Sequence, residues 1–183
     1  QAKSPIHEDG LDALLERNVG RRLNATAGLS QAFANADVVL ICVGTPFDGR
    51  QIDLTYVLKA AEEIGSLLAQ REDWCTVAVK STVVPGTTIG PVREALERAS
   101  GKRAGVDFGL GMNPEFLAEG RAVEDFMKPD RIVVGGIDER STAALADIYA
   151  RFQGVPLLKT NPSTAEMIKY ASNSFLATKI SFI

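Results

Sequence analysis

The sequence predicts an α/β protein with a mostly parallel β-sheet and helices on both of its faces. Apolar periodicity switches repeatedly along the chain between a helical and an extended pattern. Residues 37–43 form a near-continuous apolar run, which is typical of a strand buried on both faces of a parallel sheet. Because the expected strands alternate with helices of about ten or more residues, the chain reads as a series of βαβ units.

The individual elements follow from the same periodicity. Short apolar runs predict strands over residues 37–43, 74–80, 106–112, 131–134 and 155–159. Amphipathic patterns predict helices over residues 10–18, 29–36, 53–70, 86–99 and 139–152. Asp53 is placed to cap the third of these helices. A last helical pattern begins near Ser163 and continues to the final residue, so we expect both ends of the chain to lie inside a longer protein.

Composition excludes several classes of function. The 183 residues suffice for one core, or for one core and the start of a second unit, and the formal net charge is −3. No basic tract favours nucleic acid, and no apolar stretch reaches the about 18 residues of a membrane span. The opening residues lack the order of a signal peptide. We therefore expect a cytoplasmic protein with neither nucleic acid nor membrane as a partner.

The two cysteines and the single histidine do not suggest a metal site. Cys42 and Cys75 both lie in apolar runs, without a CxxC spacing or a nearby histidine. We expect both to be buried thiols, because a disulfide is rare in a cytosolic α/β protein. His7 lies in a polar segment and receives no catalytic role.

Polar motifs follow three successive predicted strands. Gly44-Thr45-Pro46 follows the first strand, Ser81-Thr82 the second and Asn113-Pro114-Glu115 the third. Ligands of parallel sheets bind beyond the carboxyl ends of the strands, so these motifs predict one rim of one site. Gly44-Thr45-Pro46 can equally be a turn that ends a strand. Thr87 and Thr88 either bind phosphate at a helix N-terminus or cap that helix, and the sequence leaves the two readings even.

Two further segments carry charged and amide groups. Glu115 and Glu119 are four residues apart, and apolar neighbours are expected to desolvate Glu115 and raise its pKa toward a general-base range. Lys169 and Asn173 share one helix face with Glu166, which is compatible with a surface lysine–glutamate pair. The apolar surroundings of this helix, at residues 167–168 and 175–176, instead predict a core element. An ammonium there is suited to stabilising a developing alkoxide.

The combination of these motifs resembles the UDP-glucose/GDP-mannose dehydrogenase family over essentially the whole chain. The segments that carry the resemblance occur in family order: residues 4–6, 44–46, 80–82, 85–88, 113–120, 129–131 and 166–180. The resemblance implies a Rossmann-like NAD-binding domain, followed by the start of a long central connecting helix. It also implies an enzyme that oxidises the 6-hydroxymethyl group of a nucleotide sugar to a carboxylate with two NAD per turnover, for polysaccharide synthesis.

The family pattern assigns roles to residues of this chain. It implies that Glu115 assists thioester hydrolysis, that Lys169 stabilises the oxyanion, that Asn173 orients water and that Thr82 helps to hold that water. Cofactor contacts are expected from Thr45, Pro46, Ser81, Thr82 and Glu119. Substrate contacts are expected from Phe116, Leu117, Glu119 and Lys169.

The chain departs from the family pattern in two places. The glycine-rich phosphate loop at the start of the family is absent, and so is the later segment with the nucleophilic cysteine. We therefore expect residues 1–161 to be a partial NAD-binding domain and residues 162–183 to begin the central helix. By itself this polypeptide is expected to be inactive and to bind NAD poorly. The parent is expected to form a homodimer through the central helix.

Two other readings remain open. A β-hydroxyacid dehydrogenase would share the Lys169–Asn173 helix and NAD(P), but it does not explain residues 113–117. A nucleotide-binding module without catalysis would explain the fold but not the joint presence of Glu115, Lys169 and Asn173. The choice between UDP-glucose and GDP-mannose is also open. Residues 100–109 resemble the GDP-mannose branch of the family, whereas residues 118–120 and 129–131 resemble the UDP-glucose branch.

Overall fold

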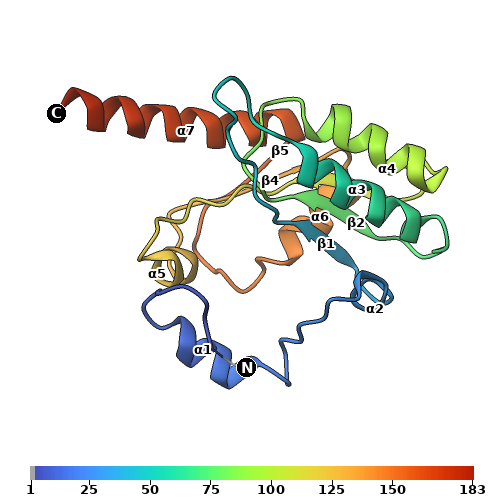
Figure 1. Ribbon diagram of the computed structural model, residues 1–183, viewed down its shortest axis with the longest axis horizontal. Coiled ribbons are helices and arrows are strands. Elements are labelled where there is room, and N and C mark those ends of the chain that lie inside the picture. The colour runs from blue at the N-terminus through green and yellow to red at the C-terminus, as the bar shows by residue number, and fades with distance from the viewer. Residues whose placement is uncertain (1–2) are drawn as a thin grey trace.

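Five strands form a single sheet in the computed structural model, which describes residues 3–183 (Figure 1). Gln1 and Ala2, the first residues of the segment tested for a signal peptide, lie outside the described residues. The strands lie side by side in chain order: β1 (Val38–Ile41), β2 (Thr76–Val79), β3 (Gly109–Met112), β4 (Ile132–Gly136) and β5 (Leu157–Thr160). All neighbouring pairs are parallel except β3 and β4, which are antiparallel. The predicted α/β class with a mostly parallel sheet is confirmed.

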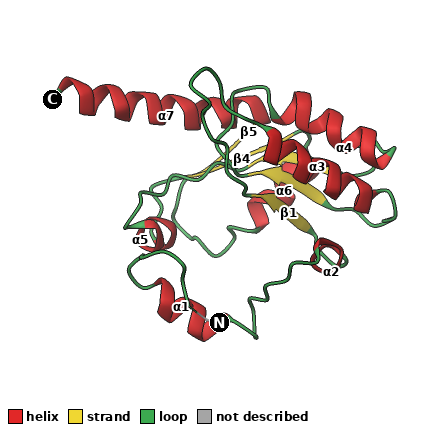
Figure 2. Ribbon diagram, in the orientation of Figure 1, coloured by secondary structure: helices red, strands yellow, loops and turns green. Residues whose placement is uncertain are grey.

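Helices follow most of the strands (Figure 2). They are α1 (Leu11–Asn18), α2 (Leu29–Phe33), α3 (Thr55–Leu68), η1 (Thr88–Val92) continuing into α4 (Arg93–Ser100), α5 (Ala122–Met127), α6 (Glu139–Asp147) and α7 (Pro162–Phe182). The side chain of Asn161 caps α7 by accepting a hydrogen bond from the Thr164 N–H at 2.9 Å, and Pro162 takes the first helical position. None of these helices in residues 3–183 is long and apolar enough to cross a membrane.

The sheet is covered on both faces. The larger core cluster joins α3, α4 and the start of α7 to one face, and includes Val57, Leu96, Val133 and Ala165. The smaller cluster packs α6 against the other face, around Leu145. Burial of these apolar side chains is the main source of stability for the three-layer arrangement.

The outer strand β1 is less buried than its apolar sequence predicts. Ile41 is buried, but residues 38–40 are only half-buried, and Cys42 just beyond the strand is exposed. In the described residues β1 pairs with β2 alone, which leaves its other edge uncovered. The expectation of a buried Cys42 is therefore wrong. Cys75 is buried as expected, and desolvation raises the pKa of its thiol.

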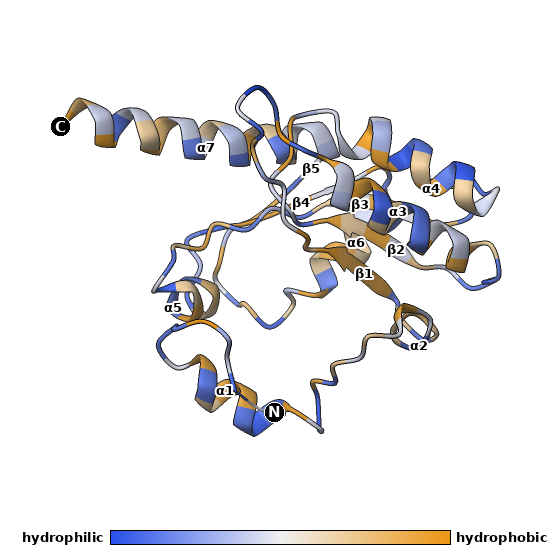
Figure 3. Cartoon of the chain, viewed as in Figure 1, coloured by the Kyte–Doolittle hydropathy of each residue, from blue (hydrophilic) through white to orange (hydrophobic). Residues whose placement is uncertain are grey.

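Helix α7 is a core element only in its first two turns. Ala165, Glu166 and Lys169 are buried, whereas Phe175 is 73% exposed and Leu176 is 56% exposed. Figure 1 and Figure 3 show that α7 runs past the end of the sheet, and within residues 3–183 the apolar side chains of its second half stay largely exposed. The predicted burial around residues 175–176 is wrong for the described structure.

A glycine lets α7 begin close to the sheet. A Cβ atom placed on Gly135 of β4 would lie 2.5 Å from the carbonyl oxygen of Asn161 and 2.9 Å from the Cβ atom of Ala165. Any larger residue at this position would push the start of α7 outward. The close approach therefore fixes where the side chains of α7 project.

Candidate functional site

The loops that follow β1 and β2 are joined by side-chain hydrogen bonds. The Thr45 hydroxyl donates to the carbonyl oxygen of Thr82 at 2.8 Å. The Ser81 hydroxyl donates to the carbonyl oxygen of Val43 at 2.6 Å. Both strands point the same way, so these loops meet at the carboxyl edge of the sheet. Thr45, Ser81 and Thr82 are half-buried there, while Pro46 is exposed.

The loop after β3 meets helix α7. Lys169 Nζ lies 2.8 Å from Glu115 Oε1, and the Lys169 side chain is almost wholly buried. The second oxygen of Glu115 accepts the N–H of Leu117 at 2.7 Å. A buried ammonium is costly unless it is paired, and Glu115 supplies that pair. The structure thus brings together the two charged residues that the sequence placed 54 positions apart.

The electrostatics of Glu115 differ from the sequence-based expectation. Burial is the largest single influence on the pKa of Glu115, and it raises that pKa. The hydrogen bonds from Lys169 and from the Leu117 N–H, with the positive charges of Lys169 and Lys80, together outweigh burial. The pKa of Glu115 therefore lies below its ordinary value, and the predicted rise is wrong. Glu115 is an ion-paired carboxylate in this structure.

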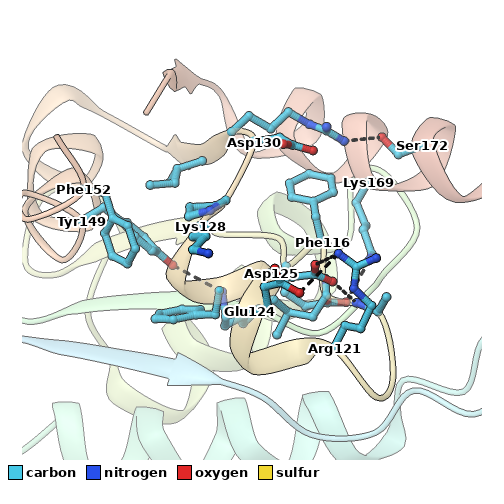
Figure 4. Close-up of a pocket in the computed structure, with 18 of the residues that line it drawn as sticks. Phe116, Arg121, Glu124, Asp125, Lys128, Asp130, Tyr149, Phe152, Lys169 and Ser172 are labelled. Carbon is cyan, nitrogen blue, oxygen red and sulfur yellow. Dashed lines mark hydrogen bonds and ion pairs between the residues drawn. The ribbon is translucent and has the colours of Figure 1, made fainter. Parts of the chain in front are cut away.

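A cavity of about 620 Å³ opens beside this ion pair (Figure 4). It lies between α7, α5 and the segment that joins β3 to α5. Its walls combine aromatic side chains with charges of both signs, which is the composition of a site for a polar molecule with an apolar part. The lining residues are Lys80, residues 115–118, Arg121, residues 124–126, residues 128–132, Tyr149, Phe152, Lys169, Ser172, Asn173 and Leu176.

Two cations lie close to the Phe116 ring at the cavity wall. The Arg131 guanidinium lies 4.3 Å from the centre of the Phe116 ring, and Lys169 Nζ lies 5.5 Å from it. Arg131 also donates a hydrogen bond to Ser172 of α7 at 3.3 Å. Cation–π contacts of this kind hold a ring in one orientation. Asn173, one turn beyond Lys169, is exposed and faces the same cavity.

Glu119 is placed differently from its expected partners. It is exposed in a turn ahead of α5, which begins only at Ala122. Among the described residues that line the cavity, Glu115, Phe116 and Leu117 are present and Glu119 is not. The structure therefore does not join Glu119 to the other predicted substrate residues.

Sequence reasoning missed a polar cluster at the cavity wall. Asn113 is buried, and its amide donates to the Val133 carbonyl at 2.9 Å while its oxygen accepts the Tyr149 hydroxyl at 2.6 Å. Lys80 Nζ lies 3.2 Å from the same Asn113 oxygen. The signal for Lys80 is its place directly after four buried residues of β2, where an ammonium needs a polar partner. Tyr149 has no comparable signal in the sequence.

The segment around Thr87 and Thr88 is neither an empty anion site nor a helix with its own cap. The Gly86 and Thr88 N–H groups donate to the two carboxylate oxygens of Glu166, at 2.6 and 2.8 Å. The side chain of Thr87 instead donates to the carbonyl of Val84. Glu166 is fully buried, so it is not a surface partner of Lys169. Neither sequence-based interpretation of this segment holds, because the acceptor for its N–H groups is the Glu166 carboxylate of α7.

A parallel sheet that gathers hydroxyl, carboxylate and ammonium groups at the carboxyl ends of its strands has the architecture of a nucleotide-binding domain. The sequence model of the NAD binding domain of the UDP-glucose/GDP-mannose dehydrogenase family matches residues 1–153. The chain belongs to this family. The resemblance read from the sequence motifs is confirmed, and so is NAD as the cofactor of the domain.

Curated relatives of both substrate branches match nearly the whole chain. It is 46% identical to a UDP-glucose 6-dehydrogenase of Haloferax volcanii, with 98% of this chain and 43% of the relative covered. It is 42% identical to the GDP-mannose 6-dehydrogenase of Pseudomonas aeruginosa, with 100% of this chain and 42% of the relative covered. The chain thus spans about two fifths of the length of the curated relatives that it matches.

Solved structures of dehydrogenases from both substrate branches also match nearly the whole chain. A ternary complex of GDP-mannose dehydrogenase from Pseudomonas aeruginosa superposes with a TM-score of 0.94 at 42% identity, covering 100% of this chain and 42% of that chain. A UDP-glucose dehydrogenase from Pyrobaculum islandicum superposes with a TM-score of 0.91 at 45% identity, covering 99% of this chain and 41% of that chain. The fold is therefore that of the family.

The residues at the ends of β1 and β2 fit an NAD molecule. A Cβ atom placed on Gly44 meets nothing within 4 Å, so the backbone is open to a ligand. Thr45 and Thr82 lie next to it and are held together by their hydrogen bond. Small residues with hydroxyl groups at this edge allow close contact with a ribose or an amide.

Proposed function

We propose that this chain is part of an NAD-dependent nucleotide-sugar 6-dehydrogenase that oxidises UDP-glucose or GDP-mannose to the uronic acid. In this proposal residues 1–161 supply part of the NAD-binding domain and residues 162–183 begin the central helix. The observation that carries the proposal is the ion pair between the buried Lys169 and the half-buried Glu115 at the edge of the cavity. Family membership supports the reaction class, and the polar, aromatic lining of the cavity supports a sugar as substrate.

The proposed reaction removes four electrons in two hydride transfers. NAD⁺, when bound beside Thr45 and Thr82, would supply the hydride acceptor for C6 of the sugar. The alcohol loses a hydride and a proton to become an aldehyde, and a cysteine thiol from the rest of the protein adds to it. This thiohemiacetal then loses a second hydride, for which a second NAD⁺ would be the acceptor, and the proton of its hydroxyl group, which gives a thioester. Water cleaves the thioester to the carboxylate, the free thiol and a proton.

In this mechanism the residues of the chain bind, orient and stabilise. Lys169 has three N–H donors, so it can bind the oxygen on C6 while it keeps its contact with Glu115. Glu115, held as a carboxylate, accepts a hydrogen bond from the attacking water. Asn173 and Thr82 orient that water. Phe116 and Leu117 form the wall against the sugar.

The cofactor side is assigned to the neighbouring loops. Thr45, Pro46, Ser81 and Thr82 line the ends of β1 and β2, where the nicotinamide half of NAD is proposed to bind. Glu119 is assigned to the cofactor and the sugar by family resemblance alone, because its exposed place ahead of α5 adds no support.

Of the two rival functions, neither is favoured by a specific observation. A β-hydroxyacid dehydrogenase is disfavoured by membership of a family of nucleotide-sugar dehydrogenases. A module without catalysis is disfavoured by the paired Lys169 and Glu115, because a buried ammonium such as that of Lys169 is costly to keep without a role.

We further propose a cytoplasmic homodimer, with a role in polysaccharide synthesis. The exposed apolar side chains of α7, including Phe175 and Ile180, support association through this helix. Sedimentation of the whole protein tests this association, since the Phe175→Asp variant is expected to shift it toward the monomer.

The deciding experiment counts the NADH released per sugar by the whole protein, offered UDP-glucose and GDP-mannose separately. Two NADH per molecule of one sugar would establish the four-electron reaction and name the substrate. No NADH from either sugar would contradict the proposed function. The isolated 183 residues are expected to show no turnover, and measurable turnover by them would overturn the assignment of the thioester step to a cysteine elsewhere.

A further inference from the structure

Glu166 is a fully buried acidic residue that the proposed reaction does not use. Its Oε2 atom accepts the N–H of Gly86 at 2.6 Å and its Oε1 atom accepts the N–H of Thr88 at 2.8 Å. These contacts join the second turn of α7 to a loop about 80 residues earlier in the chain. Hydrogen bonds from backbone N–H groups to a carboxylate are among the stronger ones, and burial strengthens them further.

The loop needs such an acceptor because of its backbone geometry. Gly86 has a φ of 95°, a left-handed conformation, and the following helix begins at Thr88 with an unusually wide turn. The first N–H groups of a helix have no acceptor within the helix, and η1 has no side-chain cap of its own. The Glu166 carboxylate meets this need and also places a negative group at the positive end of the helix dipole.

The two ends of this contact carry different parts of the site. Thr82 lies four residues before Gly86 on the loop, next to Thr45. Lys169 lies three residues after Glu166 on α7 and therefore projects from the same helix face. The Glu166 carboxylate is thus a direct connection between the cofactor side and the oxyanion side of the site.

We propose that Glu166 is a positioning residue that holds the loop of residues 81–88 against α7, so that Thr82 and Lys169 keep one spacing across the bound NAD and sugar. This inference rests on the proposed function for its catalytic consequence, but not for the contact itself. Glu166 touches neither ligand in this scheme. Its effect passes through the two residues that do.

The test compares Glu166→Gln with Glu97→Gln in the whole protein. Glu97 is a matched control, because its carboxylate also accepts a backbone N–H, that of Ala104 at 3.0 Å, at the far end of the same η1–α4 helix. In Glu166→Gln one backbone N–H faces an amide NH₂ group and loses its acceptor. We expect faster hydrogen exchange at Gly86 and Thr88, and a KM for NAD⁺ raised by on the order of 10-fold. Glu97→Gln is expected to leave both unchanged.

A double-mutant cycle separates positioning from a general loss of stability. If Glu166 acts through Thr82, the losses in kcat/KM from Glu166→Gln and Thr82→Ala will be clearly less than additive. Full additivity, wild-type kinetics in Glu166→Gln, or a loss that follows only the unfolded fraction with an unchanged KM would each overturn the proposal. A wild-type protein that releases no NADH contradicts the proposed function instead. Hydrogen exchange and NAD⁺ titration of Glu166→Gln then still decide whether the contact positions the loop.

Discussion

Lys169 Nζ lies 2.8 Å from Glu115 Oε1, and this contact joins helix α7 to the loop after β3. Only 6% of the Lys169 surface is exposed, while Glu115 is half-buried and faces the cavity. The ammonium is therefore held in a fixed place, with its remaining donors available to a ligand. This contact underlies the first three predictions.

Replacing Lys169 by alanine is expected to lower turnover by roughly 100-fold or more, because the donor to the developing oxyanion is lost. Steady-state kinetics of the whole protein measure this effect. Lys159→Ala, at an exposed lysine of β5, serves as the control and should leave turnover unchanged. An unaltered rate in Lys169→Ala would remove this residue from the mechanism.

The pKa of Glu115 is expected to rise in Lys169→Met. The wild-type protein holds this pKa below its usual value through Lys169, the Leu117 N–H and Lys80, against the effect of burial. Without Lys169, its hydrogen bond and its positive charge no longer oppose burial, so the pKa is higher than in the wild-type protein. Carboxyl-carbon NMR titration follows the change, and Glu115→Gln identifies the resonance by its absence.

The lowered pKa of Glu115 determines how the stability of the protein depends on pH. Because the pKa of Glu115 is lower in the folded state, its contribution is fully present above the unfolded-state pKa and is lost as pH falls through the folded-state pKa. Urea unfolding at a series of acidic pH values should show a smaller decline for Glu115→Gln. An identical decline in both proteins would contradict the assignment.

Thr45→Val is expected to raise the KM for NAD⁺ by about 10-fold, because the Thr82 carbonyl loses its donor and the two loops separate. Thr45→Ser keeps the hydroxyl and should restore most of the affinity. Titration of NAD⁺ by fluorescence measures both variants. Equal NAD⁺ affinities of the Thr45→Val and Thr45→Ser variants would mean that the hydroxyl has no part in placing the loops.

Gly135→Ala is expected to lower the free energy of unfolding by about 1–3 kcal/mol, since the added methyl group collides with Asn161 and Ala165 at the start of α7. Denaturant unfolding gives this value. Gly28→Ala is the matched control, because its added methyl group would meet only ordinary contacts of 3.6 Å or more. Equal stability of the two variants would show that α7 can shift without cost.

Much of the fold could be predicted because it depends on local pattern. Short apolar runs separated by amphipathic helices predict the strands, and their ends, correctly to within a few residues. The polar residues Thr45, Ser81, Thr82 and Glu115 were found for the same reason, since parallel strands place their carboxyl ends at one edge. Burial at β1 and in the second half of α7 could not be predicted, because it depends on which neighbours cover them.

The sequence alone determined the class of fold, the family and the residue types at the site, because periodicity and motif order are properties of the chain itself. Tertiary structure decided how the charges pair. Glu166 lies closer in sequence to Lys169, yet the helix turns it toward the backbone of Gly86 and Thr88, while Glu115 reaches Lys169 from another loop. The balance between burial and these contacts sets the pKa of Glu115, and that balance exists only once distant segments have packed together.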